Sequence, residues 1–394
     1  MRILIAPDKF KGSLRAAQVA EAVERGIKKA LPEAETRRLP LADGGLGTVE
    51  AIVKAAGGEI IKCPATGPLG EPVDSYFGLF SSPELPGQTR AIIEMAAASG
   101  LHLVPKDKLN PLIATTYGTG ELIKAALDED VAEIVVGIGD SATVDGGIGM
   151  AQALGVRFLD EEGRDLGRDG EEPARLKRID LLGRDPRIAD TRILVASDVT
   201  NPLFGPDGAA FVYGPQKGAT PEMVRILEAG LRNYAQVIKE QLGKDVGTMP
   251  GAGAAGGLGA GLVAFLDARI ESGIQFIMKI SGLEEKLEGV DAVITGEGRI
   301  DSQTFYGKAP MGVAELAGKK NIPVYAICGQ TGPGAEKVHE HGITKIFSLS
   351  DIASSLDDAR QNAAKYVEIA AEKLAAELAE AADPRPTVPP RAAP

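Results

Sequence analysis

Charged and hydroxyl side chains follow the first apolar run of the sequence, in the segment Pro7-Asp8-Lys9-Phe10-Lys11-Gly12-Ser13. Two lysines in this position suit a phosphate or a carboxylate, because ammonium groups and the amides of a helix N-terminus both attract anions. Open α/β sheets bind their ligands at the carboxyl ends of strands, where this segment is expected. A solvated loop without a ligand is the alternative. Lys9 and Lys11 are therefore candidates for anion binding.

Three glycines in four positions characterise the segment Asp43-Gly44-Gly45-Leu46-Gly47, which again follows an expected strand and precedes an expected helix. Glycine allows the backbone to approach a ligand closely. Asp43 could face that ligand, or it could only cap the helix. Capping explains Asp43 but not the glycines, so this segment is a second candidate loop.

A third loop, at residues 139–147, combines small residues, two hydroxyls and two carboxylates. The Ser141 and Thr143 hydroxyls together with clustered amides make a reasonable cradle for an anion. Asp140 and Asp145 suit phosphate-linked Mg²⁺, which one or two carboxylates usually hold. Turns that bond to their own backbone are the alternative for both aspartates.

Asp198 and Asn201 follow the apolar run that ends at Ala196. An aspartate at the end of a strand, with an asparagine three residues later, could act as base and metal ligand in phosphoryl transfer. For Asn201, which precedes Pro202, turn formation is the alternative.

Glycines are densest at residues 251–259, where Gly251, Gly253 and Gly256 have the GxGxxG spacing. This spacing alone is a weak signal for a dinucleotide, and here a helix and a polar loop precede it instead of a strand. A glycine-rich loop that opens a helix still suits nucleotide phosphates. Close packing of the helix through small residues is the alternative.

The segment from Thr295 to Lys308 brings two carboxylates, a guanidinium and an amine into one loop. Arg299 could grip a carboxylate or phosphate with two parallel hydrogen bonds. Glu297 and Asp301 could instead form salt bridges within the loop, which would explain fewer of these residues.

The elements that must position these loops read as a parallel α/β sheet at both ends of the chain. Residues 2–6 and 36–40 are expected strands, with helices expected at 14–31, capped by Ser13, and at 48–56. Near the other end the expected strands are 292–294, 324–328 and 345–349. We therefore expect the two ends to build one doubly wound domain.

The middle of the chain reads as a mixed α/β insertion, with a long helix at 221–242 that Thr220 caps. We place the first domain at 1–75 plus 285–381 and the inserted domain at 76–284. A proline-rich tail at 382–394 is expected to be disordered. A chain of 394 residues suggests two domains with a cleft between them.

Composition restricts the possible classes of function. A formal net charge of −12 and a pI near 5.0 argue against a nucleic-acid partner. The start of the sequence lacks a signal peptide, and no apolar run reaches about 18 residues, so we expect a cytoplasmic protein without membrane contact. His102, His339 and His341 have no metal or triad spacing, and neither a GxSxG elbow nor a P-loop occurs.

Taken in order, these segments resemble the type I bacterial glycerate kinase family from Met1 to about Glu380. The resemblance is carried by residues 7–13, 42–45, 116–121, 141–143, 197–203, 251–259 and 296–301. It implies a discontinuous flavodoxin-like domain with an inserted mixed α/β domain and an active site in the cleft between them. It also implies phosphorylation of D-glycerate with ATP and Mg²⁺, most simply at the 2-hydroxyl.

The resemblance, together with the loops, assigns provisional roles. The catalytic residues are Asp198, Lys9 and Asp43; the substrate-binding residues are Lys11, Arg299, Asn201 and Ser13. The nucleotide-binding residues are Ser141, Thr143, Gly251, Gly253, Gly256 and Gly257, and the metal ligands are Glu297, Asp301 and Asp145. Three alternatives stay open: a glycerate 3-kinase, a catalytically impaired ligand-binding relative, and an NAD-dependent oxidoreductase. The sequence leaves the oligomeric state open.

The chain departs from the family pattern at three loop positions: the pattern usually has Glu where this chain has Leu46, Gly at Asp140 and Asn at Val144. Leucine can neither bind a metal nor accept a proton. We therefore expect Asp140 to supply the carboxylate that is missing at position 46.

Overall fold

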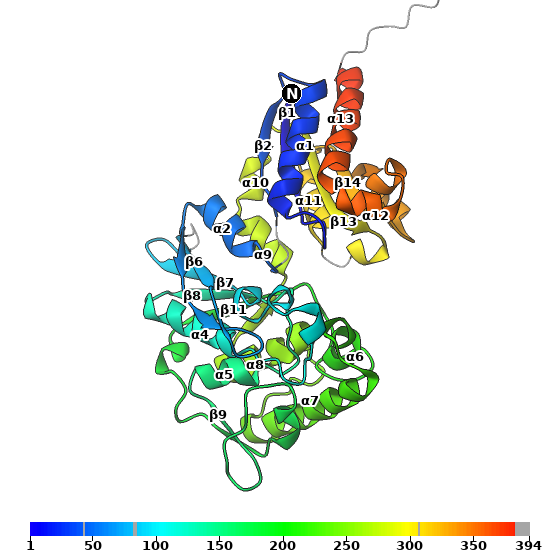
Figure 1. The fold of residues 1–394 in the computed structure, drawn as a ribbon. Helices are drawn as coiled ribbons and strands as arrows, with labels where there is room; N and C mark the ends of the chain where they lie inside the picture. The colour runs from blue at the N-terminus through cyan, green and yellow to red at the C-terminus, as the bar shows by residue number, and fades with distance from the viewer. Residues whose placement is uncertain (42–43, 82–84, 306–307, 383–394) are drawn as a thin grey trace, which may run out of the picture. The chain divides into compact units, whose positions relative to one another are not determined.

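The computed structural model of the protein describes residues 1–41, 44–81, 85–305 and 308–382. The chain divides into two compact units, each with its own internal packing. Unit 1 combines Met1–Leu41 with Leu283–Pro394, and unit 2 is Ala42–Gly282. Figure 1 shows the ribbon of both units and labels many of the elements named below. Asp43, a predicted catalytic residue, lies outside the described residues.

A parallel sheet forms the centre of unit 1, in the strand order β15-β14-β13-β1-β2. Its strands are β1 (Arg2–Pro7), β2 (Glu35–Arg38), β13 (Ala292–Ile300), β14 (Val324–Thr331) and β15 (Ile343–Ser348). Alternate residues of β1 face opposite sides of the sheet. Ile3 and Ile5 belong to the core under α1 (Ala16–Ala30) and α13 (Ala363–Ala382). Leu4, on the opposite face, is fully buried as well. β1 is therefore buried on both faces, as is usual in a parallel sheet.

Helices α1 and α13 lie side by side in unit 1, blue and red in Figure 1. They approach closely at Gly26, where a Cβ atom would lie only 2.2 Å from the carbonyl oxygen of Glu368. A third helix, α11 (Ala309–Gly318), contacts β1, β13 and β14. The remaining helical elements are α10 (Leu283–Lys286), α12 (Leu356–Gln361), η7 (Ser302–Phe305), η8 (Ala335–His341) and η9 (Leu349–Asp351).

Unit 2 is built on a mixed sheet in the order β12-β11-β8-β7-β6-β3. Strands β7 (Thr89–Glu94), β8 (Glu133–Gly137), β11 (Arg192–Ala196) and β12 (Arg269–Glu271) are parallel, and β6 (Tyr76–Ser81) and β3 (Glu59–Lys62) are antiparallel to their neighbours. Two small antiparallel pairs join β4 (Ala65–Thr66) to β5 (Pro72–Val73) and β9 (Arg157–Leu159) to β10 (Arg178–Asp180). Parallel strands end at the same edge, so the loops after β7, β8 and β11 meet there.

Helices complete unit 2 on the two faces of this sheet. Helices α2 (Thr48–Ala56) and α9 (Gly273–Ile280) contact each other, and α2 also contacts β6, β3 and β7. The other helices are α3 (Ala96–Ser99), α4 (Tyr117–Asp128), α5 (Ile148–Ala153), α6 (Ala209–Tyr213), α7 (Pro221–Leu242) and α8 (Leu258–Leu266). The short 3-10 turns are η1 (Leu101–Leu103), η2 (Lys106–Lys108), η3 (Glu172–Arg175), η4 (Pro186–Ala189), η5 (Pro215–Lys217) and η6 (Ala254–Gly257).

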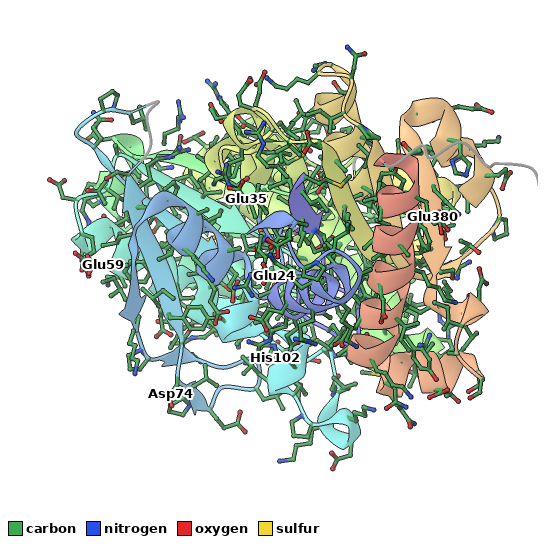
Figure 2. The ribbon with its side chains drawn as sticks, turned by 90° about the horizontal axis from the view of Figure 1, so that it is seen from above. Glu24, Glu35, Glu59, Asp74, His102 and Glu380 are labelled. Atoms are coloured by element: carbon green, nitrogen blue, oxygen red, sulfur yellow. The ribbon has the colours of Figure 1, made fainter. Side chains whose placement is uncertain are left out.

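The mixed α/β fold with parallel sheets agrees with the sequence prediction, whereas the predicted boundary at residue 75 does not match the division of the chain. The structure places residues 42–75 in unit 2, because β3 pairs with β6 in the unit 2 sheet. The exposed side chains of Glu59 and Asp74, labelled in Figure 2, therefore belong to unit 2. The inserted domain was predicted to end at residue 284, and unit 2 ends at Gly282 in the structure.

Local signals differ in how well they located helix ends. Helix α7 begins and ends as predicted, with Thr220 Oγ1 accepting a hydrogen bond from the N–H of Met223. Ser13 is not the cap of α1: the helix begins after Arg15, whose N–H donates to the Gln18 side chain. Ser13 instead lies in a turn in which its N–H donates to the Phe10 carbonyl.

Candidate functional site

In unit 1, two of the predicted loops meet at the carboxyl ends of β1 and β13. Pro7, the last residue of β1, lies opposite Gly296 in the parallel register. β13 continues beyond this point to Ile300, so Glu297 and Arg299 lie on the strand and not in the expected loop. A Cβ atom on Gly298 would lie 3.1 Å from the backbone nitrogen of Lys11. The backbone of residues 10–11 therefore lies directly against that glycine. The structure therefore brings the lysine loop next to the strand that carries Glu297 and Arg299.

The lysine loop presents part of its charge at the surface. Asp8 is buried and its Oδ1 accepts a hydrogen bond of 2.6 Å from the N–H of Lys9. Lys9 is half-buried, whereas Lys11 and Ser13 are exposed. The Ser13 hydroxyl donates to the Phe10 carbonyl at 3.3 Å. Lys11 is thus the residue of this loop that can most easily reach a ligand in solution.

Glu297 is a buried carboxylate with partners for both oxygens. Its Oε1 accepts a hydrogen bond of 2.7 Å from the Thr304 hydroxyl, and its Oε2 lies 3.1 Å from the Lys308 ammonium. Burial raises the pKa of Glu297, and the adjacent Lys308 ammonium opposes that shift. The carboxylate therefore depends on a nearby positive charge to remain ionised.

Arg299 and Asp301 form the salt bridge that the sequence left as an alternative, with 2.8 Å between Nε and Oδ2. The arginine side chain is half exposed, so this ion pair contributes little to stability. Carboxylate oxygens are the ligands that Mg²⁺ prefers, so Glu297 and Asp301 fit this metal by chemistry. Each already faces a cation of the chain, which a bound Mg²⁺ would replace as the counter-charge.

In unit 2, loops far apart in sequence meet at the carboxyl edge of the sheet. The N–H of Gly139 donates to the Gly44 carbonyl at 3.1 Å, which joins the second and third candidate loops. The N–H of Gly253 donates to the carbonyl of Asn201, and the N–H of Gly146 donates to that of Gly256. The four loops at residues 44–47, 139–147, 197–203 and 251–257 therefore form one connected region.

Glu94, at the end of β7, is a buried carboxylate that sequence reasoning missed. It accepts hydrogen bonds from the N–H groups of Gly47 and Val49, at 2.9 and 3.2 Å, and from the Tyr76 hydroxyl at 2.5 Å. These amides belong to the N-terminus of α2, which attracts negative charge. Burial raises the pKa of Glu94, and these hydrogen bonds oppose the shift. The Glu94 carboxylate thus occupies the position at the N-terminus of α2 where an anion would otherwise bind.

Asp198 occupies the N-terminus of α9 in a similar way. Its oxygens accept hydrogen bonds from the Ser272 hydroxyl at 2.7 Å and from the N–H of Ile274 at 3.1 Å. Donors of this kind stabilise the ionised carboxylate and fix its orientation. The residue is half-buried at the end of β11, where a proton acceptor could still be reached.

The Asn201 side chain is used within its own loop. Its Nδ2 donates to the Asp207 carbonyl, and its Oδ1 accepts from the Tyr213 hydroxyl, both at 2.7 Å. The alternative of a turn-forming role, stated above, accounts for these contacts. Any contact of Asn201 with a substrate stays a prediction.

Asp145 is fully buried and holds together the loop around it. Its Oδ2 accepts hydrogen bonds from the N–H and hydroxyl of Thr116, at 2.8 and 2.7 Å, and its Oδ1 accepts from the N–H of Gly147 at 3.1 Å. The contact with the amide of Gly147, two residues further along the chain, is the turn chemistry that was the alternative. The role of Asp145 as a metal ligand stays a prediction.

The glycines of residues 251–257 are required by packing within unit 2. A Cβ atom on Gly253 would lie 2.1 Å from the Pro202 carbonyl oxygen, and one on Gly256 would lie 2.0 Å from that of Thr143. Gly251 and Gly257 have φ values of +84° and +94°, which side-chain-bearing residues rarely adopt. Because packing explains these glycines, they are not independent evidence for a nucleotide, and the loop's contact with phosphates stays a prediction.

Ser141 and Thr143 are both buried, and both contact a residue that sequence reasoning missed. The Lys217 ammonium donates to Ser141 Oγ and to the Thr143 carbonyl, each at 2.7 Å. Burial lowers the pKa of Lys217 to about 7, although Asp145 opposes the shift. Its sequence context, Gly214-Pro215-Gln216-Lys217-Gly218, resembles an ordinary polar turn and gave no signal of this burial.

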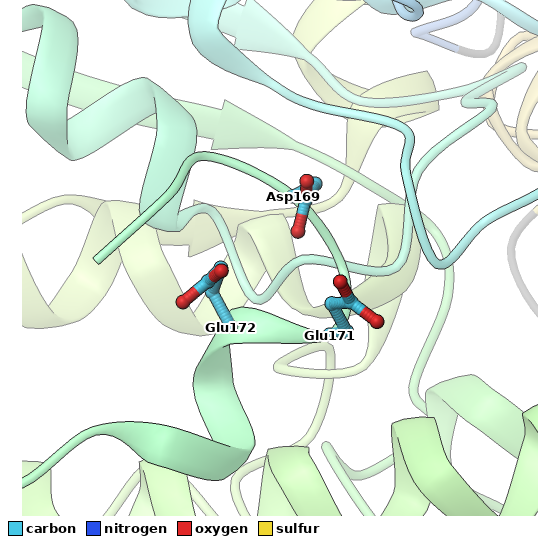
Figure 3. A group of neighbouring side chains, drawn as sticks. All are labelled: Asp169, Glu171 and Glu172. Carbon is cyan, nitrogen blue, oxygen red and sulfur yellow. The ribbon is translucent and has the colours of Figure 1, made fainter. Parts of the chain in front are cut away.

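Asp169, Glu171 and Glu172 form a group of acidic side chains elsewhere in unit 2, shown in Figure 3. One oxygen from each lies within 4.8 Å of the others. Arg175 pairs with Glu172 at 3.1 Å, so part of this charge is already balanced. Acidic groups at a surface commonly cluster without a ligand, and we assign no metal to this one.

Among the described residues, no helix combines the length and the apolar character needed to cross a bilayer.

Comparison with known proteins gives one consistent result. The family model described as the glycerate kinase family matches residues 3–379. A protein of Halalkalibacterium halodurans named glycerate kinase is 52% identical over 373 residues, covering 95% of this chain and 97% of the relative. An Escherichia coli K12 protein named glycerate 2-kinase is 48% identical over 379 residues, covering 96% of this chain and 98% of the relative. A crystal structure from Salmonella typhimurium LT2, a proposed glycerate kinase 2, superposes with a TM-score of 0.79 at 46% identity. The match covers 97% of this chain and 99% of that one.

Proposed function

Because the chain belongs to the glycerate kinase family, we propose that this glycerate kinase transfers the γ-phosphate of ATP to the 2-hydroxyl of D-glycerate. The products are 2-phosphoglycerate and ADP. The observation that carries the proposal is the family match over residues 3–379, which includes every candidate loop. The similarity to a relative named glycerate 2-kinase favours the 2-hydroxyl over the 3-hydroxyl.

In unit 1, the lysine loop and the end of β13 are proposed to bind glycerate. Lys11 and Arg299 supply positive charge for the glycerate carboxylate, since both side chains are exposed and lie on adjoining segments. Lys9 offsets charge that develops on the transferred phosphoryl group. Ser13, on the same exposed turn, offers a hydroxyl to the substrate.

Glu297 and Asp301 are proposed to hold Mg²⁺ together with phosphate oxygens of the nucleotide. When bound, the metal neutralises charge on those phosphates. Lys308 and Arg299, which now pair with the two carboxylates, provide the counter-charge until the metal binds.

In unit 2, the loop at residues 139–147 is proposed to receive the nucleotide phosphates through Ser141, Thr143 and neighbouring amides, with the glycine-rich loop of residues 251–257 behind it.

Asp198 is proposed to accept the proton of the attacking hydroxyl. The glycerate oxygen then forms a bond to the γ-phosphorus while the bond to the ADP oxygen breaks. The donors at the N-terminus of α9 keep Asp198 ionised and aligned for this step. Asn201 remains a proposed substrate contact on the loop that carries Asp198.

Two finer structural statements are part of the proposal. The strand order of unit 1, counted along its own chain, is 2-1-3-4-5, the order of flavodoxin-like domains. We therefore propose that unit 1 is a discontinuous flavodoxin-like domain. We also propose that the protein acts in the cytoplasm and has neither nucleic-acid nor membrane partners, on the sequence grounds given above.

The test is steady-state release of ADP that depends on D-glycerate, followed by phosphorus NMR of the product. We expect turnover with ATP and Mg²⁺ and a product signal of 2-phosphoglycerate. A 3-phosphoglycerate signal would correct the regiochemistry alone. Absence of turnover at millimolar substrates, with ATP or glycerate still bound, would favour the impaired relative. Binding of NADH in a fluorescence titration would favour the oxidoreductase.

A further inference from the structure

Lys217 places a buried ammonium group directly behind the loop at residues 139–147. It is only 2% exposed and comes from η5, more than 70 residues further along the chain than its partners. Burying a lysine is costly unless its N–H groups find acceptors. Ser141 Oγ and the Thr143 carbonyl are two such acceptors, at 2.7 Å each.

The chemistry of an ammonium group fixes the direction of the hydrogen bond to Ser141. When Lys217 is protonated, its ammonium can only donate, so the Ser141 oxygen then accepts. The hydrogen of the Ser141 hydroxyl is then left for another acceptor, and among the described residues no side chain or carbonyl takes it. Ser141 is 8% exposed, so a small part of the residue is accessible to solvent.

Thr143, on the same loop, carries a second hydroxyl whose hydrogen has no acceptor among the described residues. Thr143 is fully buried, and within the described part of the chain its Oγ1 has no hydrogen-bond partner. Buried hydroxyls are rarely left unpaired. These two hydroxyls have hydrogens to donate, and the Lys217 amino group lies against the same loop. The combination suits an anionic oxygen.

We propose that Lys217 is a positioning residue for phosphate binding: it directs the Ser141 hydroxyl hydrogen toward a phosphate oxygen of the nucleotide. The inference rests on the proposed function, in which this loop receives the phosphates. Lys217 acts through Ser141 and fixes the loop backbone through the Thr143 carbonyl. The enclosed carboxylate of Asp145 supplies a compensating negative charge nearby.

The chain offers a matched control in Lys244. This lysine likewise donates to two oxygens of unit 2, here the carbonyls of Val263 and Ala264, at 3.0 and 2.7 Å. It additionally pairs with Asp267 at 2.6 Å, and its side chain is 31% exposed. Its partners lie near the end of α8 and not on the loop at residues 139–147. Lys244→Met therefore removes a comparable set of contacts without touching the proposed phosphate donors.

The experiment is a double-mutant cycle on nucleotide binding. Lys217→Met and Ser141→Ala are each expected to raise the Kd and KM for ATP about tenfold, the effect of one charge-assisted hydrogen bond. The double variant is expected to be no weaker than the weaker single variant, because both changes abolish the same directed hydrogen bond from Ser141 to the phosphate. The KM for D-glycerate should stay within twofold of wild type, and Lys244→Met should bind ATP like wild type.

Each outcome decides something. Effects of Lys217→Met and Ser141→Ala that multiply in the double variant would show that the lysine acts independently of the hydroxyl, which overturns the inference. An unchanged ATP Kd in Ser141→Ala would also overturn it, and that small substitution keeps the test valid if Lys217→Met does not fold. A wild-type protein that neither binds ATP nor phosphorylates glycerate would instead refute the proposed function.

Discussion

The carboxylate of Asp140 accepts a hydrogen bond from the backbone N–H of Leu46, with 3.1 Å between Oδ2 and the nitrogen. The two residues are 94 positions apart in sequence. Asp140 has a φ of +58°, in the left-handed region that favours glycine and that aspartate tolerates better than most residues. This conformation accounts for glycine as the usual residue of the family pattern at position 140. It also places the Asp140 carboxylate beside position 46, where the pattern has glutamate.

The first prediction follows from this pair. Asp140→Gly alone should lose most turnover, because it removes the carboxylate that contacts the N–H of Leu46. The double change Leu46→Glu with Asp140→Gly should retain turnover, since it returns a carboxylate to this place. The kcat of ADP release measures both variants. Equal activity in the wild type and both variants would show that neither carboxylate matters.

The second prediction concerns Glu94 at the N-terminus of α2. Glu94→Ala should lower the free energy of unfolding by about 3 kcal/mol, because the amides of Gly47 and Val49 and the Tyr76 hydroxyl lose a buried acceptor. Glu94→Gln keeps one carbonyl oxygen and should lose less. Urea denaturation compares the two. A larger loss in the glutamine variant would contradict this account of the site.

The third prediction separates catalysis from stability at Asp198. Asp198→Asn should lower kcat at least about 100-fold, because an amide cannot accept the substrate proton. The asparagine oxygen can still accept from the N–H of Ile274, so the melting temperature should change little. Ser272→Ala is the control: it removes one donor to the carboxylate but leaves the base in place. Wild-type turnover in Asp198→Asn would exclude this residue as the base.

The fourth prediction concerns pH and Asp169. Burial, together with Glu172 and Glu171, raises the pKa of Asp169 to about 6. The folded protein therefore binds a proton more tightly than the unfolded chain, and this stabilisation is lost as the pH rises from about 4 through about 6. Asp169→Asn should raise the free energy of unfolding at pH 7.5 by on the order of 1 kcal/mol, a value reduced by solvent screening, with less gain at pH 4.5.

Asp165→Asn serves as the opposite control in the same measurement. Arg157 holds the pKa of Asp165 below its usual range, so the carboxylate favours folding once it is ionised. Its loss should reduce stability at pH 7.5. If both variants shift stability in the same direction at that pH, local charge does not explain the effect at Asp169.

The sequence predicted the elements whose signals are local. Thr220 followed by Pro221 located the start of α7, and the apolar run that ends at Ala196 located β11. The loops after parallel strands were identified because such strands end at one edge of a sheet. The predicted boundary at residue 75 left β3 in the first domain, because a short strand pattern does not reveal which sheet the strand joins.

The partners of the candidate residues could not be predicted in this way. Glu94 ends a strand and gives no sign that its carboxylate reaches the N-terminus of α2, 45 or more residues earlier. Lys217 follows a proline in a polar stretch, and only tertiary packing buries it. Burial and hydrogen bonding of single side chains depend on distant segments, which periodicity and spacing do not report.

The pairing of β1 with β13 fixes an order of events during synthesis. β1 is made early, but its neighbour in the sheet and α13 over the same core follow only after unit 2 is complete. At roughly 5–20 residues per second, the N-terminal segment waits on the order of tens of seconds on the ribosome. We expect unit 2 to fold first and the N-terminal strand to remain exposed to chaperones and proteases until the rest of unit 1 emerges.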